Sequence, residues 1–285
     1  MVKNETQFYY KNYPILTHKS LEEIKRAISE KILEIQISLD LGLSTEMITI
    51  NPENNSFIIN SIDEVLFPTS FDEEEKICYF ILDQQIFPLK LFNEYSNFYY
   101  KLVPTSWRPI LRISATPMHK KPFLDAIERL QFRGFVLDSG TGLGYSAIIA
   151  SKTATRVITI EWDESVLEIA TYNPHSKDLF SKDNIQLLLG DVTEEILRFD
   201  DKYFDVLIQD GGMPKSSGNF FSQSHCNQLY RVLKPGGELI MYLPQHGKAK
   251  GRDYGGEHLE RLKRAGFYIK KRVLEGSWAL LYKGA

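Results

Sequence analysis

Residues 135–150 read FVLDSGTGLGYSAIIA, a short apolar run followed by an acid, three glycines and a second apolar run. Phe135–Leu137 has the length and character of a buried strand. Gly140, Gly142 and Gly144 follow, and because glycine has no Cβ they predict a tight turn that lets the backbone approach a neighbour or a ligand. The apolar residues after the turn predict a helix. A strand, a bare turn and a helix in this order are typical of an α/β sheet.

The chain after residue 120 repeats this alternation of strand and helix. Short apolar runs are followed by segments with helical periodicity. We therefore expect a doubly wound, Rossmann-like α/β sheet that is mostly parallel and carries an antiparallel C-terminal strand. The expected strands are 135–138, 156–161, 185–191, 205–210, 238–243, 267–275 and 277–283. The expected helices are 122–130, 145–154, 164–172, 193–198, 221–233 and 255–265, with a turn at 234–237.

Residues 1–119 have a different pattern, rich in β-branched and aromatic residues and interrupted by prolines. One segment, 21–33, has helical periodicity, and Ser20 and Glu23 have the spacing of a capping box. We therefore predict two domains. A smaller, β-rich N-terminal domain with this one helix covers 1–119, and the α/β domain covers 120–285.

The composition limits the classes of function. With 285 residues, of which 43% are hydrophobic, the chain has enough apolar material for a sizeable core. It contains no apolar stretch that fits a membrane span or a signal peptide, which favours a cytoplasmic protein. The net charge of −3 gives no general reason to bind nucleic acids. Cys78 and Cys226 match no disulfide or zinc spacing, so both are expected to be buried and no metal site is predicted.

The glycine spacing and Asp138 together narrow the choice of ligand. A dinucleotide fingerprint has the spacing G-x-G-x-x-G, whereas these glycines lie at 140, 142 and 144. A carboxylate at the carboxyl end of the first strand repels a pyrophosphate and favours a ligand with an ammonium or sulfonium group. S-adenosylmethionine carries both groups. We therefore expect Asp138, Gly140, Gly142 and Gly144 to contact this cofactor.

Further positions match an adenosine ligand. Glu161 ends the second strand, close to the spacing from Asp138 at which an acid reaches ribose hydroxyls in such folds. Trp162 is placed to stack on the adenine ring. Asp191 ends the third strand and is expected to accept a hydrogen bond from the adenine amino group, with the N–H of Val192 beside it. Because the carboxyl ends of parallel strands meet at one edge, these acids are expected to line a single site.

The order of the motifs resembles that of class I S-adenosylmethionine-dependent methyltransferases. The resemblance is carried by VLDSGTGLGY, VITIEWDE, LLLGDV, FDVLIQD and YRVLKPGGELIMY. It implies a Rossmann-like cofactor domain with Tyr145 among the cofactor-binding residues and S-adenosylhomocysteine as the product. A narrower likeness, carried by ISLDLGLS, YYKLVPT, ISATPMHK and GKAKGRD, is to archaeal predicted methyltransferases related to spermidine synthases. It implies that Met118 and His119 lie near the cofactor.

The end of the fourth strand departs from one branch of this family. Asp210 is followed by Gly211 and Gly212, where amino-group methylases of nucleic-acid bases carry Asn or Asp, two prolines and an aromatic residue. Methylation of base amino groups is therefore not supported. Asp210 is expected to join the other acids and to be the catalytic residue, which orients a substrate amine or receives its proton.

These features predict an S-adenosylmethionine-dependent methyltransferase whose acceptor stays open among small molecules, RNA and proteins. One alternative is an aminopropyltransferase that resembles spermidine synthase and acts on a polyamine, although LDSGTG stands where those enzymes have GGGDG. Another is a protein that binds the nucleoside without catalysis. Nine Lys and Arg residues within 248–272 offer a local surface for RNA. The oligomeric state is left open, and a homo-oligomer is compatible with the sequence.

Overall fold

The structure, a computed structural model, describes residues 7–59, 63–69, 71–72, 74–118, 121–211, 218–243 and 253–285. The chain separates into two compact units. The first comprises Met1–His119 and Ser165–Phe180, and the second comprises Lys120–Glu164 and Ser181–Ala285. The segment Ser165–Phe180, which the sequence pattern places among the elements of the second half, thus groups with the first unit.

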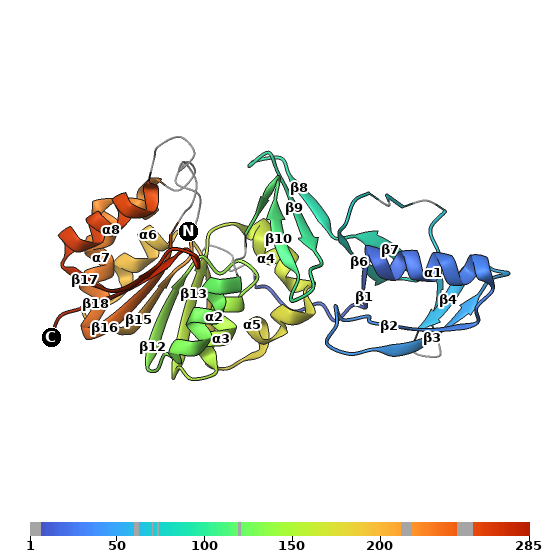
Figure 1. The fold of residues 1–285 in the computed structure, drawn as a ribbon, viewed down its shortest axis with the longest axis horizontal. Coiled ribbons are helices and arrows are strands. Elements are labelled where there is room, and N and C mark those ends of the chain that lie inside the picture. Colours follow the sequence, from blue (N-terminus) through green and yellow to red (C-terminus); the bar gives the residue numbers. More distant parts are fainter. Residues whose placement is uncertain are drawn as a thin grey trace. The chain divides into compact units, whose positions relative to one another are not determined.

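The first unit is built on antiparallel sheets, as the sequence predicts for the N-terminal part (Figure 1). The sheets have the strand orders β1-β6-β7, β2-β3-β4-β5 and β11-β10-β9-β8. The strands are β1 (Ile15–Thr17), β2 (Glu34–Ile37), β3 (Glu46–Asn51), β4 (Ser56–Ile59), β5 (Asp63–Leu66), β6 (Cys78–Leu82), β7 (Gln85–Pro88), β8 (Lys90–Asn93), β9 (Phe98–Val103), β10 (Ile110–Ile113) and β11 (Thr116–Pro117). The helices are α1 (His18–Glu30), α4 (Glu164–Thr171), the 3₁₀ turn η1 (Pro174–Ser176) and α5 (Lys177–Ser181).

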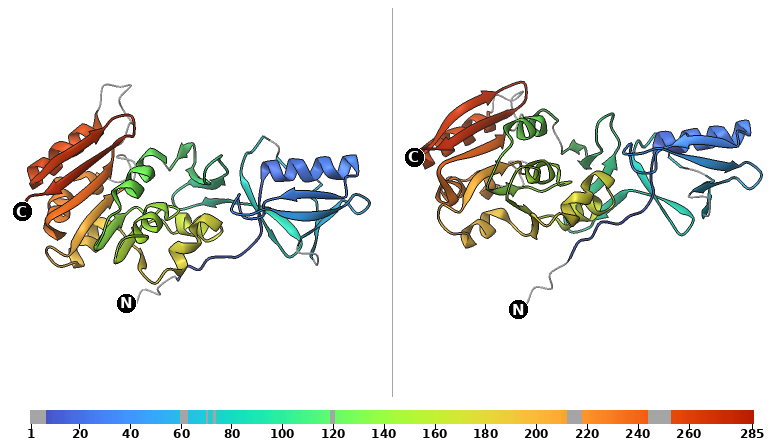
Figure 2. Two further views of the ribbon diagram at one scale, coloured as in Figure 1. Left: turned by 60° about the horizontal axis from the view of Figure 1, so that its bottom comes forward. Right: turned by 90° about the horizontal axis from the view of Figure 1, so that it is seen from below.

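Helix α1 begins earlier than the sequence pattern predicts. Its N-cap is Thr17, the last residue of β1, whose side chain accepts a hydrogen bond from the N–H of Ser20. The predicted capping box at Ser20 is therefore wrong, because a hydroxyl one turn earlier already occupies the capping position. The helix ends before Lys31, which is left-handed with φ 56°. Its apolar side packs against β2 and β3, and Figure 2 shows it lying along that sheet.

The second unit contains the predicted α/β sheet. The strand order is β14-β13-β12-β15-β16-β18-β17, and β18 is antiparallel to both of its neighbours. The strands are β12 (Phe135–Ser139), β13 (Arg156–Glu161), β14 (Ile185–Leu189), β15 (Phe204–Gln209), β16 (Leu233–Tyr242), β17 (Phe267–Val273) and β18 (Trp278–Lys283). The helices are α2 (Lys121–Leu130), α3 (Tyr145–Ser151), α6 (Val192–Glu195), the 3₁₀ turns η2 (Ile196–Arg198) and η3 (Gly218–Phe221), α7 (Gln223–Val232) and α8 (Tyr254–Ala265).

The strand order creates a switch point beside β12. From β12 the chain adds β13 and β14 on one side and β15 and β16 on the other, all parallel (Figure 1). In sheets of this kind ligands bind at the carboxyl ends of the strands next to the switch point. The fold therefore brings the ends of β12, β13, β14 and β15 to one edge, where the predicted acids lie.

The structure also bears on two smaller predictions, the burial of the cysteines and the turn at 234–237. Both cysteines, Cys78 and Cys226, are buried and free, as expected. At the predicted turn 234–237 the pairing of β16 with β15 is interrupted, because Phe204 pairs with Leu233 while Val206 pairs with Glu238, and Gly236 has a positive φ of 76°. Among the residues that the structure describes, no helix is long and apolar enough to cross a membrane.

Asp205, near the start of β15, links the amino ends of three neighbouring strands at the other end of this sheet. Its carboxylate accepts hydrogen bonds from the N–H of Phe135 at the start of β12 and from the ammonium of Lys234 in β16. The side chain also fills the space beside Gly134, where a Cβ would lie 2.2 Å from its Oδ2 atom.

We predict that Asp205→Ala lowers the free energy of unfolding by about 1–3 kcal/mol, because it leaves a partly buried N–H and an ammonium without their acceptor. Asp201→Ala is the control, because Asp201 is exposed and its ion pair with Arg231 lies at the surface. That change should cost less than about 0.5 kcal/mol. Urea unfolding of the full chain measures both, and equal losses would contradict the assignment.

Candidate functional site

The glycine turn after β12 has a backbone that requires glycine. Gly140, Gly142 and Gly144 all have positive φ, at 92°, 56° and 81°. A Cβ on Gly140 would lie 2.3 Å from the carbonyl oxygen of Asp210, the residue that follows β15. The turn and the end of β15 can therefore approach each other only because the side chain is absent. The backbone conformation thus confirms the predicted tight glycine turn at the carboxyl end of the first strand.

Asp138 lies near the end of β12, just before the turn, and is fully buried. Its Oδ2 atom accepts hydrogen bonds from Ser146 Oγ at 3.0 Å and from Thr159 Oγ1 at 2.8 Å. Thr141 in turn contacts the Thr159 hydroxyl at 2.6 Å. The Oδ1 atom has no hydrogen-bond partner among the residues that the structure describes. One oxygen of this carboxyl group is thus held by the protein, and the other is left for a ligand or a proton.

The pKa of Asp138 is raised from 3.8 to about 7. Burial is the main cause, since a charged group loses its hydration inside the protein. Hydrogen bonds from Thr159 and Ser146 oppose the shift, and the carboxylates of Asp210 and Glu161 add to it. The three acids are therefore close enough to repel one another, which favours any ligand that brings positive charge to this edge.

Glu161 ends β13 and is held by backbone N–H groups. Its Oε2 atom accepts from Gly142 at 2.9 Å, and its Oε1 atom accepts from Trp162 and Asp163, each at 3.1 Å. Burial raises its pKa from 4.5 to about 7, against the effect of these hydrogen bonds. A carboxylate oxygen can accept two hydrogen bonds. Oε2 therefore keeps one acceptor position beside the glycine turn.

The residues predicted for adenine lie at the ends of β13 and β14. Trp162 follows Glu161 directly and is 62% exposed, which agrees with a side chain that can reach a ligand. Asp191 is the N-cap of α6, where its Oδ1 atom accepts from the N–H and the hydroxyl of Thr193. Val192 begins the helix with a buried side chain. The capping role of Asp191 was not predicted, and it fixes this carboxylate at the strand end.

Asp210 follows β15 and is bound to the first strand through its backbone, because its N–H donates to the carbonyl of Ser139. Its carboxylate is close enough to Tyr242, the last residue of β16, to raise the pKa of that phenol in addition to the effect of burial. An acid and a phenol therefore share the edge at the ends of two neighbouring strands. Sequence reasoning did not select Tyr242, although its position at the end of a predicted strand is a usable signal.

A buried polar cluster behind Asp210 was also missed. Gln209 Oε1 and His258 Nε2 lie 3.1 Å apart, and both side chains are buried. His225 is only 3% exposed and packs against the ring of Phe220. Burial lowers the pKa of His225 to about 4 and that of His258 to about 3, so both rings are neutral near pH 7. The signal for Gln209 was a polar residue at the end of an otherwise apolar strand.

For the other residues predicted at the cofactor site, contact with a ligand stays a prediction. Tyr145 begins α3 with its side chain fully buried, so its contact with a ligand stays a prediction. Met118 belongs to the first unit, where its N–H donates to the carbonyl of Leu111. His119 and Gly212 lie outside the described residues.

The basic stretch 248–272 is only partly described, because 248–252 lie outside the described residues. Of the rest, Lys263 pairs with Glu260, and Lys270 of β17 pairs with Glu238 of β16, on the other side of β18. Arg272 lies 3.5 Å from Asp253. These acids offset much of the positive charge that the sequence pattern counts, so RNA binding by this stretch stays a prediction without structural support.

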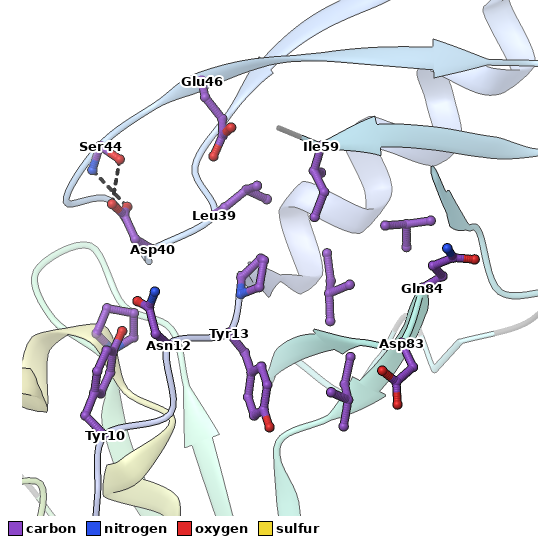
Figure 3. A pocket seen from close by; sticks show the side chains of 15 residues that line it. Tyr10, Asn12, Tyr13, Leu39, Asp40, Ser44, Glu46, Ile59, Asp83 and Gln84 are labelled. Carbon is purple, nitrogen blue, oxygen red and sulfur yellow. Dashed lines mark hydrogen bonds between the residues drawn. The ribbon is translucent and has the colours of Figure 1, made fainter. Parts of the chain in front are cut away.

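A separate cavity of about 560 Å³ lies in the first unit (Figure 3). Asp40, Glu46 and Asp83 line it around an apolar floor, and Ser44 donates to Asp40 through its N–H and its hydroxyl. None of the residues predicted for the cofactor is among the described residues that line it. The predicted acids instead meet at the sheet edge of the second unit.

Comparison with known proteins agrees with this fold. Residues 134–271 match the model of a methyltransferase domain. The uncharacterized protein MJ1233 of Methanocaldococcus jannaschii is 37% identical over 278 residues, which cover 91% of this chain and 92% of that protein. The chain belongs to the MJ1233 family. Its C-terminal half carries a methyltransferase domain with the fold of S-adenosylmethionine-dependent enzymes.

Two spermidine synthase structures are similar in fold to this chain. One, a complex with the transition-state analogue AdoDATO, has a TM-score of 0.56 at 16% identity and covers 68% of this chain and 72% of its own. The other, from Thermotoga maritima, has a TM-score of 0.53 at 15% identity and covers 68% and 71%. At this identity the likeness concerns the fold alone.

The two buried acids make stability depend on pH in a defined direction. Because the pKa of Asp138 is raised from 3.8 to about 7, the folded protein keeps a proton that the unfolded chain releases above about pH 4. The free energy of unfolding should therefore fall as the pH rises from about 4 to about 7 and then level off. Glu161 contributes in the same direction.

We predict that Asp138→Asn makes this fall smaller, because the amide does not titrate. Glu194→Gln, which removes an exposed carboxylate, is the control and should leave the pH dependence as it is. Urea unfolding across this pH range measures the effect. An unchanged slope in Asp138→Asn would show that Asp138 ionises normally.

Proposed function

We propose that the chain is an S-adenosylmethionine-dependent methyltransferase. The observation that carries the proposal is the buried Asp138 carboxyl group beside a turn without side chains, with one oxygen that lacks a partner among the described residues. Such a group costs free energy unless a cation or a donor meets it. S-adenosylmethionine supplies an ammonium and a sulfonium to this edge and, when bound, donates its methyl group.

The remaining residues of the edge fit the nucleoside part. Glu161 keeps an acceptor position on Oε2 for a ribose hydroxyl, beside the glycine turn. Trp162 has an exposed ring for stacking on adenine, and Asp191 is fixed as a helix cap at the next strand end. Each of these groups binds or orients, and none needs to change its covalent state.

Asp210 is the group that we assign to the acceptor. Transfer of a methyl group to a nucleophile requires the nucleophile to be held in line and, for an amine or a hydroxyl, to lose a proton. The Asp210 carboxylate, held at the end of β15 near the Tyr242 phenol, can orient the acceptor and take that proton. Gly211 beside it lets the ring of Phe220 pack against the backbone, because a Cβ there would lie 2.4 Å from that ring.

We predict that Asp138→Asn lowers the affinity for S-adenosylhomocysteine by about tenfold or more, since a hydrogen bond between charged groups is worth about 1.5–3 kcal/mol. Methylthioadenosine is the matched control ligand because it has no ammonium group, so its affinity should hardly change. For the unsubstituted protein the affinity for S-adenosylhomocysteine should rise as the pH passes about 7, where Asp138 ionises.

Isothermal titration calorimetry with both ligands measures this. A loss that is equal for the two ligands would mean that Asp138 only supports the turn. Tighter binding of methylthioadenosine than of S-adenosylhomocysteine by the unsubstituted protein would favour aminopropyl transfer over methyl transfer.

We predict that Asp210→Asn lowers methyl transfer by about 10²–10⁴-fold, the usual contribution of a positioned acid or base, while S-adenosylhomocysteine affinity is kept. The acceptor is first found by incubating labelled S-adenosylmethionine with fractionated extract and following the label into small molecules, RNA or protein. Full transfer by Asp210→Asn would remove Asp210 from the mechanism. Binding of cofactor without any transfer in any fraction would favour a non-catalytic role.

A further inference from the structure

The sheet β11-β10-β9-β8 of the first unit has two unlike faces. On one face Tyr100, Leu102 and Leu111 are buried, with exposures of 0%, 0% and 1%. Directly paired residues of antiparallel strands point to the same side. The pairs Phe92 with Tyr99, Lys90 with Lys101, and Lys101 with Arg112 therefore share the opposite face. We call these five residues the outer face.

The outer face presents two aromatic rings to solvent. Phe92 and Tyr99 are 44% and 51% exposed, and their ring centres lie 4.6 Å apart. Tyr95, at the tip of the same hairpin, is fully exposed. Exposed aromatic residues gathered in this way are unusual for a surface that contacts only water. Flat rings on a sheet are the platform on which unpaired bases stack, a contact that tolerates any base.

The cations of the outer face lie next to these rings. Lys90 and Lys101 both pair with Glu75, and Arg112 is exposed beside Lys101. Three cations against one carboxylate leave the face positive, although the whole chain has a net charge of −3. A second copy of the chain is a poor occupant, since a symmetric contact would bring these cations against themselves. A polyanion with stacking rings complements both features.

We propose that the outer face binds single-stranded nucleic acid. The bases stack on Phe92 and Tyr99, and the phosphates lie against Lys90, Lys101 and Arg112. Glu75 limits the affinity, because its carboxylate occupies both lysines. This inference concerns binding and does not rest on the proposed methyl transfer. If RNA is bound, it names a class of acceptor for that reaction.

Fluorescence anisotropy of labelled oligouridine, with no cofactor present, tests the proposal. Phe92→Ala and Tyr99→Ala should each weaken binding by about tenfold, the order expected for one lost stacking contact. Arg112→Glu should weaken it as well and flatten its dependence on salt. Tyr268→Ala removes an exposed aromatic residue of the second unit and should change nothing. Heparin, which has the charge without the bases, should respond to Arg112→Glu and not to Tyr99→Ala.

Glu75→Gln is the variant that a folding defect cannot imitate. It frees two lysines and should tighten oligouridine binding severalfold. A parallel titration with oligothymidine separates RNA from single-stranded DNA as the occupant. The proposal fails if oligouridine and oligothymidine both do not bind, or if they bind equally to the unsubstituted protein and to the Phe92, Tyr99 and Arg112 variants. Dissociation of a dimer by Tyr99→Ala without nucleic-acid binding would overturn it in favour of a second copy.

Discussion

Burial of carboxyl groups at the ends of neighbouring strands is the constraint on which this end of the second sheet depends. Asp138, Glu161 and Asp210 end three neighbouring strands, and burial raises the pKa of the first two to about 7. The protein reduces this cost with local donors, namely hydroxyls for Asp138 and backbone N–H groups for Glu161. These donors hold the acids in place without neutralising them. The carboxyl groups are therefore held in fixed positions, where they favour a positively charged ligand.

The same constraint explains the backbone around it. The turn must pass close to both Glu161 and the end of β15, since the N–H of Gly142 reaches the Glu161 carboxylate and Gly140 lies against the Asp210 carbonyl. The approach to β15 requires a residue without a side chain, because a Cβ on Gly140 would lie 2.3 Å from that carbonyl oxygen. The three glycines thus serve the geometry of the acids as much as the access of a ligand. The strand order does the rest by placing β13 and β15 on the two sides of β12.

The parts of this arrangement that depend on local pattern could be predicted from the sequence. Apolar runs that end in acids gave the parallel strands and their common edge, because strand ends in such a sheet must meet. Contacts between distant segments could not be predicted. His225 is buried against Phe220, and Tyr242 lies near Asp210, through packing that no spacing encodes. The cap of α1 was misjudged because Thr17 ends a strand, and only the structure shows that its hydroxyl faces the helix.

Charges of opposite sign gather on the β-sheets of the two units. In the second unit, acids gather where strands end, and buried donors hold them. In the first unit, cations gather on one face of a sheet, because directly paired residues of neighbouring strands point to the same face. The carboxylate of Glu75 pairs with two of these cations. The acids at the strand ends are met by donors close to them in the sequence or the sheet, whereas Lys90 and Lys101 are met by Glu75, which lies outside the strands. An external anion that binds the outer face therefore has to replace Glu75 at these two lysines.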